Sequence, residues 1–231
     1  MIPRVLEPEV VDSQEEARDY DAMDHSAVNA RFCEDFLNLA PDVSRVLDVG
    51  TGTALIPIEL CRLSPRAHVV GVDLSEEMLA IGRENVARAG LEARVELARL
   101  DAKQTGRARG EFSAVVSNSI VHHIPEPLDA LREMHRLVAP QGVLFVRDLC
   151  RPVDLETCDA LVDAYAPEPR DVSEPAAASH RRQRELLRAS LRASLTVDEV
   201  REIAAALGIP RGAVAATSDR HWTLAWRRPV S

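Results

Sequence analysis

The residues of this sequence that could do chemistry follow short aliphatic runs. The clearest group is residues 46–54, VLDVGTGTA, where an apolar run delivers the acid Asp48 and then a Gly-x-Gly turn through Gly50 and Gly52. Two glycines permit a turn with positive φ and let a ligand approach the backbone closely. We expect a ligand-binding turn here, with an ordinary tight connection between a strand and a helix as the alternative.

A dinucleotide-binding turn would need a third glycine three residues after the second. That position is Leu55, so the dinucleotide fingerprint is incomplete. An NAD(P)-dependent oxidoreductase is therefore an alternative that this turn does not favour.

Two further acids end later aliphatic runs. Asp73 lies 21 residues after Gly52, at the distance where an acid reaches the two ribose hydroxyls in doubly wound folds. Asp101 follows a third run and could accept a hydrogen bond from an exocyclic amine such as that of adenine. The alternatives are an acid beside a helix N-terminus for Asp73 and a solvated loop acid for Asp101.

The fourth aliphatic run, residues 112–117, leads into polar residues and two histidines. Ser117, Asn118, His122 and His123 are expected at the carboxyl end of this strand, where open α/β sheets bind ligands. Histidine titrates near neutral pH, so His122 or His123 could take a proton from a reacting group. The alternative is a structural histidine that bonds a nearby carbonyl.

The elements that must position these residues are short aliphatic runs alternating with longer amphipathic ones. This alternation predicts a parallel sheet covered on both faces, in a doubly wound α/β fold. The last two runs are expected to pair antiparallel at the sheet edge. The predicted strands are 44–50, 67–73, 94–100, 112–117, 143–148, 213–218 and 221–227, and the predicted helices are 20–32, 54–63, 75–89, 127–138, 181–192 and 196–208.

Several helix ends carry the residues that usually form them. Ser75 precedes two acids and is expected to cap the helix that Gly90 ends. Thr196 with Glu199 three residues later predicts a capping box. Between the helices, residues 152–180 are rich in Pro, Ala and acids, and the prolines are expected to interrupt helical structure there.

Length and composition exclude several classes of protein. The chain has 231 residues, a net charge of −9 and only 3% aromatic residues. The acidic balance disfavours nucleic acid as a partner, and no apolar run reaches the ~18 residues that a membrane span needs. Four scattered cysteines predict neither a disulfide framework nor a metal knuckle. We expect a cytoplasmic protein with a small-molecule partner and no metal site, and the oligomeric state stays open, with a homodimer as one possibility.

Taken in this order, the four groups of residues resemble class I S-adenosylmethionine-dependent methyltransferases of the small-molecule type related to the ubiquinone and menaquinone methyltransferases. The resemblance covers residues 20–150. It implies a Rossmann-like seven-stranded sheet, mostly parallel with an antiparallel edge strand, plus a helical lid. It divides the chain into an N-terminal helical lid segment, residues 1–40, and a methyltransferase domain, residues 41–231, with a helical insertion at about 150–193.

The resemblance also implies how S-adenosylmethionine is bound. Asp48 and the glycine turn would line its methionine part, Asp73 would hold the ribose hydroxyls, and Asp101 would lie at the adenine edge. The full set of expected cofactor residues is Asp48, Gly50, Thr51, Gly52, Asp73, Leu74, Met78, Asp101, Ala102, Ser117 and Asn118.

Other residues are expected near the methyl acceptor. His122 and His123 are the candidate catalytic residues. Tyr20, His25 and Asn29 lie in the segment that often closes over the cofactor in this family. Arg147 ends the fifth strand and would bind an anionic group or pair with a nearby acid.

The residues after the fourth strand also bear on the acceptor. Ser117-Asn118-Ser119-Ile120 matches neither the Asp/Asn-Pro-Pro-Tyr nor the Pro-Cys motif of family members that methylate nucleic-acid bases. The predicted function is methyl transfer to a small molecule, which yields S-adenosylhomocysteine. The alternatives are transfer of another group or modification of the cofactor, the oxidoreductase named above, and a non-catalytic cofactor-binding module.

Overall fold

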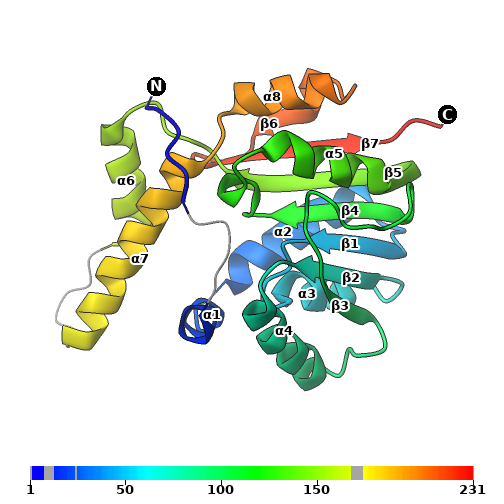
Figure 1. The fold of residues 1–231 in the computed structure, drawn as a ribbon, viewed down its shortest axis with the longest axis horizontal. Helices are drawn as coiled ribbons and strands as arrows, with labels where there is room; N and C mark the ends of the chain where they lie inside the picture. The colour runs from blue at the N-terminus through cyan, green and yellow to red at the C-terminus, as the bar shows by residue number, and fades with distance from the viewer. Residues whose placement is uncertain (1, 8–12, 24, 168–173, 231) are drawn as a thin grey trace.

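The computed structural model describes residues 2–7, 13–23, 25–167 and 174–230, which form a seven-stranded sheet with helices on both faces (Figure 1). The strands are β1 (Arg45–Val49), β2 (His68–Asp73), β3 (Val95–Arg99), β4 (Phe112–Asn118), β5 (Val138–Leu149), β6 (Val214–Ala216) and β7 (His221–Arg227). The α-helices are α1 (Gln14–Asp21), α2 (Ser26–Leu39), α3 (Leu55–Leu63), α4 (Glu76–Ala89), α5 (Pro127–Leu137), α6 (Leu155–Tyr165), α7 (Glu174–Ala193) and α8 (Val197–Ala206). Two 3₁₀ turns, η1 (Val121–His123) and η2 (Arg211–Ala213), complete the described elements.

The sheet has the strand order β3-β2-β1-β4-β5-β7-β6. Strands β1 to β5 are parallel, and β7 runs antiparallel to both of its neighbours. The direction of winding reverses between β1 and β4, and open α/β sheets bind ligands outside the carboxyl ends of the strands at such a switch point. The predicted fold, mostly parallel with an antiparallel edge, is confirmed.

The core divides into two large clusters, one on each face of the sheet. Leu47 of β1 packs with Met134 of α5 on one face, and its neighbour Val46 packs with Phe36 of α2 on the other. Successive residues of a strand point to opposite faces, so both faces of β1 are apolar and buried. This burial holds the carboxyl ends of the central strands rigidly in place.

The predicted helix ends are confirmed at three positions. The Ser75 hydroxyl accepts a hydrogen bond from the Met78 amide at 3.2 Å, and Gly90 ends α4 with φ +66°. Thr196 and Glu199 form the capping box at the start of α8. These contacts are local, which is why the sequence alone predicts them.

The segment before β1 corrects one prediction. The single helix expected over 20–32 is wrong, because α1 ends at Asp21 and α2 begins at Ser26. Ala17 of α1 packs against Met78 and Ile81 of α4, whereas Phe32 of α2 packs into the core of the sheet. These two contacts belong to separate hydrophobic clusters. The break between α1 and α2 allows one helix to pack on α4 and the other on the sheet.

The insertion contains more helix than the sequence predicts. Helix α6 forms within the Pro-rich segment, with the Asp154 carboxylate accepting from the Thr157 amide at 2.8 Å, and α7 begins at Glu174 rather than at 181. Pro175 lies in the first turn of α7, where its missing N–H costs no helical hydrogen bond. Both helices lie beyond the carboxyl ends of the parallel strands (Figure 1). None of the described helices has the length and apolar character that a bilayer crossing requires.

Candidate functional site

The glycine turn after β1 adopts the left-handed backbone that its sequence predicts. Gly50 has φ +74° and Gly52 has φ +53°. The amides of Gly50 and Thr51 donate to the Val72 carbonyl at 2.8 and 3.0 Å, which ties this turn to the end of β2. A Cβ on Gly50 would lie 2.2 Å from Ile120 Cγ2, whereas a Cβ on Gly52 would meet nothing within 4 Å. The Ile120 side chain, from the connection between β4 and η1, therefore packs directly against the Gly50 backbone. Gly52 faces open space.

Asp48 is a buried carboxylate beside this turn. It is 1% exposed, and neither of its oxygens has a hydrogen-bond partner among the described residues. Burial raises its pKa from 3.8 to about 7, because the charged form loses its hydration, and the neighbouring Thr51 hydroxyl opposes only part of this rise. A buried carboxylate without donors is costly unless a cation or a donor accompanies it. The position therefore suits a ligand that brings an ammonium group.

Thr51 follows the turn and packs rather than binds. It is buried, and its hydroxyl oxygen would lie 2.6 Å from a Cβ placed on Gly71 of β2. The close approach of Thr51 to β2 explains why a glycine stands at position 71. The predicted cofactor contact of Thr51 stays a prediction.

Asp73 joins the ends of β1 and β2. Its Oδ2 accepts from the Gly52 amide at 2.8 Å, and its Oδ1 accepts from the Ser75 amide at 2.9 Å. Burial raises the pKa of Asp73 above its usual value, and these two hydrogen bonds offset part of that rise. Each carboxylate oxygen has a second lone-pair direction, so Asp73 keeps capacity to accept from two hydroxyls of a ligand.

The residues expected around an adenine lie at the ends of β2 and β3. Asp101 is partly exposed, and its Oδ1 accepts from the Lys103 amide at 2.8 Å. Leu74 is half-buried, and its carbonyl accepts from Arg99 at 3.0 Å. Met78 is 7% exposed under α1. Asp101, Leu74 and Met78 thus lie at the same edge of the sheet. The Asp101 carboxylate also stabilises its own loop through the hydrogen bond from Lys103.

Ala102 and the two residues at the end of β4 complete the predicted cofactor set. Ala102 is half-buried and packs against the core cluster on the α5 side of the sheet. The buried Ser117 hydroxyl donates to the Val49 carbonyl at 2.8 Å, so this side chain links β4 to β1. Asn118 is half-buried at the last position of β4, opposite Arg147 of β5.

Helix α1 covers this edge of the sheet. The Asn85 amide of α4 donates to Asp21 at 2.8 Å and to the Thr53 carbonyl at 3.1 Å, which fixes the end of α1 over the glycine turn. The Tyr20 ring stacks on His25 with 4.7 Å between ring centroids. Burial raises the pKa of Tyr20, and Asp73 and Asp48 raise it further. The Tyr20 hydroxyl therefore lies within the field of the two site carboxylates, although the residue is 40% exposed.

His25 and Asn29 line a different space. They border an open cavity of about 470 Å³ between α2, α3 and α4, together with Asn85 and Arg88. None of the site carboxylates Asp48, Asp73 and Asp101 lines it. Of the three residues predicted for the lid, His25 and Asn29 therefore border this cavity, and His25 also stacks on Tyr20, which does not line it.

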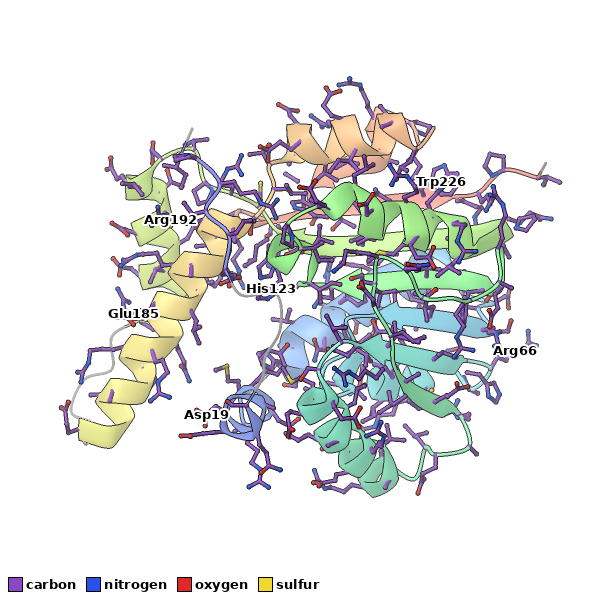
Figure 2. All side chains as sticks on the ribbon, viewed as in Figure 1. Asp19, Arg66, His123, Glu185, Arg192 and Trp226 are labelled. Atoms are coloured by element: carbon purple, nitrogen blue, oxygen red, sulfur yellow. The ribbon has the colours of Figure 1, made fainter. Side chains whose placement is uncertain are left out.

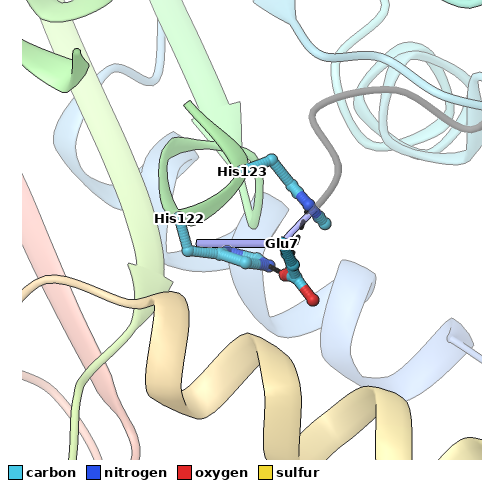
Figure 3. Close-up of side chains that lie close together, drawn as sticks. All are labelled: Glu7, His122 and His123. Carbon is cyan, nitrogen blue, oxygen red and sulfur yellow. Dashed lines mark ion pairs between the residues drawn. The ribbon is translucent and has the colours of Figure 1, made fainter. Parts of the chain in front are cut away.

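The two histidines of η1 meet partners that the sequence did not indicate. His122 is 3% exposed, and its Nδ1 lies 2.5 Å from Asp148 Oδ1 of β5. Its Nε2 lies 3.3 Å from Glu7 Oε1, and His123 Nδ1 lies 3.2 Å from the same oxygen (Figure 3). No local pattern around Glu7 marks it as a site residue, because its place depends on how the N-terminal segment folds back.

The charges of this group are coupled. Burial lowers the pKa of His122, but the Asp148 carboxylate outweighs this, so the pKa is raised overall. Burial likewise raises the pKa of Asp148, and the His122 ring outweighs this and holds it below its usual value. Asp148 follows Arg147 in β5, but its carboxylate pairs with His122.

Residues 2–7, called here the strap, are held against η1 and α7. The Arg4 guanidinium donates to the carbonyls of Ala193, His122 and Ile124 at 2.6, 3.2 and 2.9 Å. The Val5 amide donates to the Arg192 carbonyl at 3.1 Å. Figure 2 shows His123 at the carboxyl end of the sheet, between its edge and α7. The strap therefore brings Glu7 to the two histidines.

Arg147 has structural partners. Its guanidinium donates to Asp35 of α2 at 2.8 Å and to the Thr223 hydroxyl at 3.0 Å. It also lies over the rings of Phe32 and Phe145, with its central carbon 5.8 and 5.5 Å from their centroids. Of the two roles predicted for Arg147, the structure supports pairing with an acid, and that acid is Asp35.

Comparisons with known proteins concern the domain and its fold. Residues 46–142 match a family model described as a methyltransferase domain. A phosphatidylethanolamine N-methyltransferase of Cereibacter sphaeroides is 39% identical over 102 residues, which are 44% of this chain and 49% of that protein. A demethylmenaquinone methyltransferase of Listeria monocytogenes is 36% identical over 110 residues, 47% of this chain and 46% of that protein. The chain thus spans about half the length of these two curated relatives.

A solved structure shares the whole fold. A SAM-dependent methyltransferase from Aquifex aeolicus superposes with a TM-score of 0.64 over 94% of this chain and 99% of its own, at 20% identity. At that identity the likeness concerns the fold alone. It extends the match beyond residues 46–142 to the insertion and the final strands.

Proposed function

Because this chain carries the methyltransferase domain of the class I S-adenosylmethionine-dependent family, we propose that it binds S-adenosylmethionine at the carboxyl ends of β1, β2 and β3 and transfers its methyl group to a small-molecule acceptor. The domain match and the fold support this proposal, and the roles of the individual site residues are part of what is proposed. S-adenosylhomocysteine would be the product. The chain's four cysteines are free, which is consistent with the cytoplasmic location we propose.

The observation that carries the proposal is Asp48. Its carboxylate is buried, has no hydrogen-bond partner among the described residues, and stands next to two left-handed glycines. The methionine part of S-adenosylmethionine ends in an ammonium group, whose three N–H donors match this acceptor. The residues present therefore fit the cofactor, because its ammonium group would supply the donors that the Asp48 carboxylate lacks in the free protein.

Each site carboxylate has a distinct role in this proposal. Asp48 accepts from the ammonium group, Asp73 accepts from the ribose hydroxyls with its remaining lone pairs, and Asp101 accepts from the adenine amine. When bound, the cofactor supplies an electrophilic methyl group on a sulfonium. Helix α1, which packs on α4 and is tied to the glycine turn through Asn85, would limit the access of water to that region.

The acceptor is proposed to reach the site from the side of η1, α7 and the strap, where His122 and His123 lie. Much of the rate of methyl transfer can come from aligning the acceptor with the methyl group. The two relatives are named for different acceptors, phosphatidylethanolamine and demethylmenaquinone, so their names do not identify the acceptor of this chain. The net charge of −9 supports a small molecule over a nucleic acid.

The structure gives no support to other chemistry on the same cofactor. Such chemistry would need an arginine placed to grip an acidic group, for which Arg147 and Arg220 are the candidates. The Arg147 guanidinium already donates to Asp35 and Thr223, and the Arg220 guanidinium lies over the Tyr165 ring. We therefore propose no second function.

Calorimetry with S-adenosylhomocysteine tests the cofactor assignment. Asp73→Ala is expected to weaken binding by about 1.5–3 kcal/mol, the range for a lost hydrogen bond to a charged group. Asp42→Asn is the matched control, because Asp42 is exposed in the loop before β1. Saturable binding followed by mass spectrometry of candidate acceptors incubated with S-adenosylmethionine would establish the reaction. A protein that binds no S-adenosylhomocysteine, or that binds it equally well after Asp73→Ala, would contradict the proposal.

A further inference from the structure

Glu7, His122 and His123 bring three metal-ligating atoms together from two distant parts of the chain. One ligand atom from each lies within 4.8 Å of the other two (Figure 3). Glu7 Oε1 is 3.3 Å from His122 Nε2 and 3.2 Å from His123 Nδ1. For a tetrahedral metal with ligands at about 2.0–2.2 Å, neighbouring ligand atoms lie roughly 3.3–3.6 Å apart. The distances of 3.3 and 3.2 Å lie at and just below the lower end of this range.

The environment of His122 fixes which nitrogen faces Glu7. Its Nδ1 lies 2.5 Å from the buried Asp148 carboxylate, which can only accept, so Nδ1 carries the proton. In the neutral ring, Nε2 then directs a lone pair toward Glu7. Glu7 Oε1 is itself buried and makes no hydrogen bond among the described residues. Two acceptors that face each other at this distance need a positive charge between them, which is either a metal ion or the second proton of a charged His122 ring.

Asp148 completes a pattern found around bound metals. A ligating histidine nearly always donates its other N–H to a carboxylate or a carbonyl, which fixes the ring and strengthens the ligand. The Asp148 Oδ2 also accepts from the His122 amide at 3.0 Å, so the carboxylate holds both the ring and its backbone. The charges of Glu7 and Asp148 together balance those of a divalent ion.

From this geometry we propose that Glu7, His122 and His123 bind one divalent first-row transition metal on the acceptor side of the sheet. Two imidazoles and one carboxylate suit Zn²⁺ or Fe²⁺ rather than Mg²⁺ or Ca²⁺. Three protein ligands leave at least one coordination position for water or an oxygen of a ligand. His123, with 34% of its side chain exposed, gives that position access to solvent. The metal also fastens the strap to η1.

The test uses full-length protein without a polyhistidine tag, stripped with a chelator and titrated with Zn²⁺ in a calorimeter. We expect one Zn²⁺ per chain. Glu7→Gln and His123→Ala should each lower the affinity at least about tenfold, and Asp148→Asn should lower it by about 10–100-fold. His68→Ala is the matched control, because His68 is exposed at the opposite end of the sheet and should leave the affinity unchanged.

Co²⁺ gives a second measurement, because its visible absorption reports the number and arrangement of the ligands. Wild type should show the intense bands of a four-coordinate site, and His123→Ala should lose them. Circular dichroism checks folding, and His123→Ala carries the test if another variant fails to fold. Wild type that binds no Zn²⁺ saturably, or equal affinity in wild type, Glu7→Gln and His123→Ala, would overturn the proposal, and a proton on His122 would then be the cation. The cofactor residues are separate, so either outcome leaves the proposed S-adenosylmethionine site standing.

Discussion

Asp48 is buried and Asp73 is half-buried, and the two carboxylates differ in the hydrogen-bond donors that the protein supplies. Asp73 accepts from two backbone amides, at the glycine turn and at the start of α4. Asp48 accepts from no described residue. Removing Asp73 therefore disturbs the connection between two turns, whereas Asp48 affects the free protein mainly through its charge. The two residues call for different experiments.

The stability of the cofactor-free protein should depend on pH through Asp48. Its pKa of about 7 in the folded protein lies above the unfolded value near 3.8, so the folded state holds the extra proton and stability falls as pH rises from about 4 to about 7. Asp48→Asn removes that loss. At about 1.4 kcal/mol per pKa unit, its advantage over wild type should reach on the order of 4 kcal/mol above pH 7 and be small at pH 4. Urea unfolding of both proteins across this range measures it, and an advantage independent of pH would count against the prediction.

The two glycines of the turn separate backbone strain from crowding by a neighbouring element. Gly52→Ala should cost about 1–2 kcal/mol, because the left-handed backbone penalises a side chain and nothing lies near the new Cβ. Gly50→Ala should cost a further 1–3 kcal/mol or so, because its Cβ would overlap Ile120. Urea unfolding measures both.

Ile120→Ala provides the control for that comparison. In a double-mutant cycle it should relieve the extra cost of Gly50→Ala and leave the cost of Gly52→Ala unchanged. If Ile120→Ala changes the cost of both glycine substitutions equally, the contact with Ile120 is not the reason that Gly50→Ala is more destabilising than Gly52→Ala.

At the scale of elements, the strap depends on one arginine. Arg4 donates to carbonyls of η1 and of the end of α7. Arg4→Met keeps the length of the side chain and removes these hydrogen bonds, so it should destabilise the protein by about 1.5–3 kcal/mol. Hydrogen exchange should quicken at the amides of Val5 and His123 and stay unchanged in β1. Arg31→Met is the control, because Arg31 is exposed on α2, and unaltered exchange in Arg4→Met would contradict the role of the strap.

Elements were predictable where the cause is local. Strands β1, β2, β4 and β5 each contain a run of buried apolar residues because both faces of the sheet are covered, and the Ser75 and Thr196 caps involve residues three positions apart. The break between α1 and α2 and the start of α7 were missed. The break between the helices arises because α1 packs on α4, which the local sequence does not indicate. Helix α7 begins earlier than predicted because Pro175 lies in its first turn, where proline is tolerated.

The same distinction applies to the site. That Asp48, Gly50, Gly52 and Asp73 lie together was predictable, because they follow predicted strands and parallel strands end at one edge. Glu7 was missed because 115 residues separate it from His122 and only the folded strap brings them together. The separate positions of Tyr20 and Asn29 could not be predicted either, because they follow from the turn between α1 and α2.

At the scale of the whole molecule, the proposed cofactor site joins elements that are otherwise independent. Its residues come from the ends of β1, β2 and β3 and from α1, so a ligand there links the lid to the sheet. Binding to the folded state alone stabilises it by mass action, by about 2.7 kcal/mol at a hundredfold excess over Kd. If the domain unfolds cooperatively, this increase in the free energy of unfolding applies to the entire domain.

Thermal unfolding measures this coupling. S-adenosylhomocysteine at a hundredfold excess over Kd should raise Tm by about 5–10 °C, since 1 kcal/mol corresponds to about 2–4 °C in a chain of this length. Asp48→Asn should show a smaller shift at the same concentration, because the ammonium group loses its charged partner. A ligand that raises Tm equally in both proteins would show that Asp48 does not face the ammonium group.

The position of the strap has a practical consequence for handling the protein. Ile2 to Glu7 run beside η1 and α7, whereas β7 leads away toward the opposite end of the sheet (Figure 1). A purification tag placed ahead of Ile2 would start a few residues from Glu7 and His123, and a polyhistidine tag there would supply competing imidazoles. A tag added after Val230 would begin far from them. Recombinant protein for metal or acceptor assays is therefore best tagged at the carboxyl terminus.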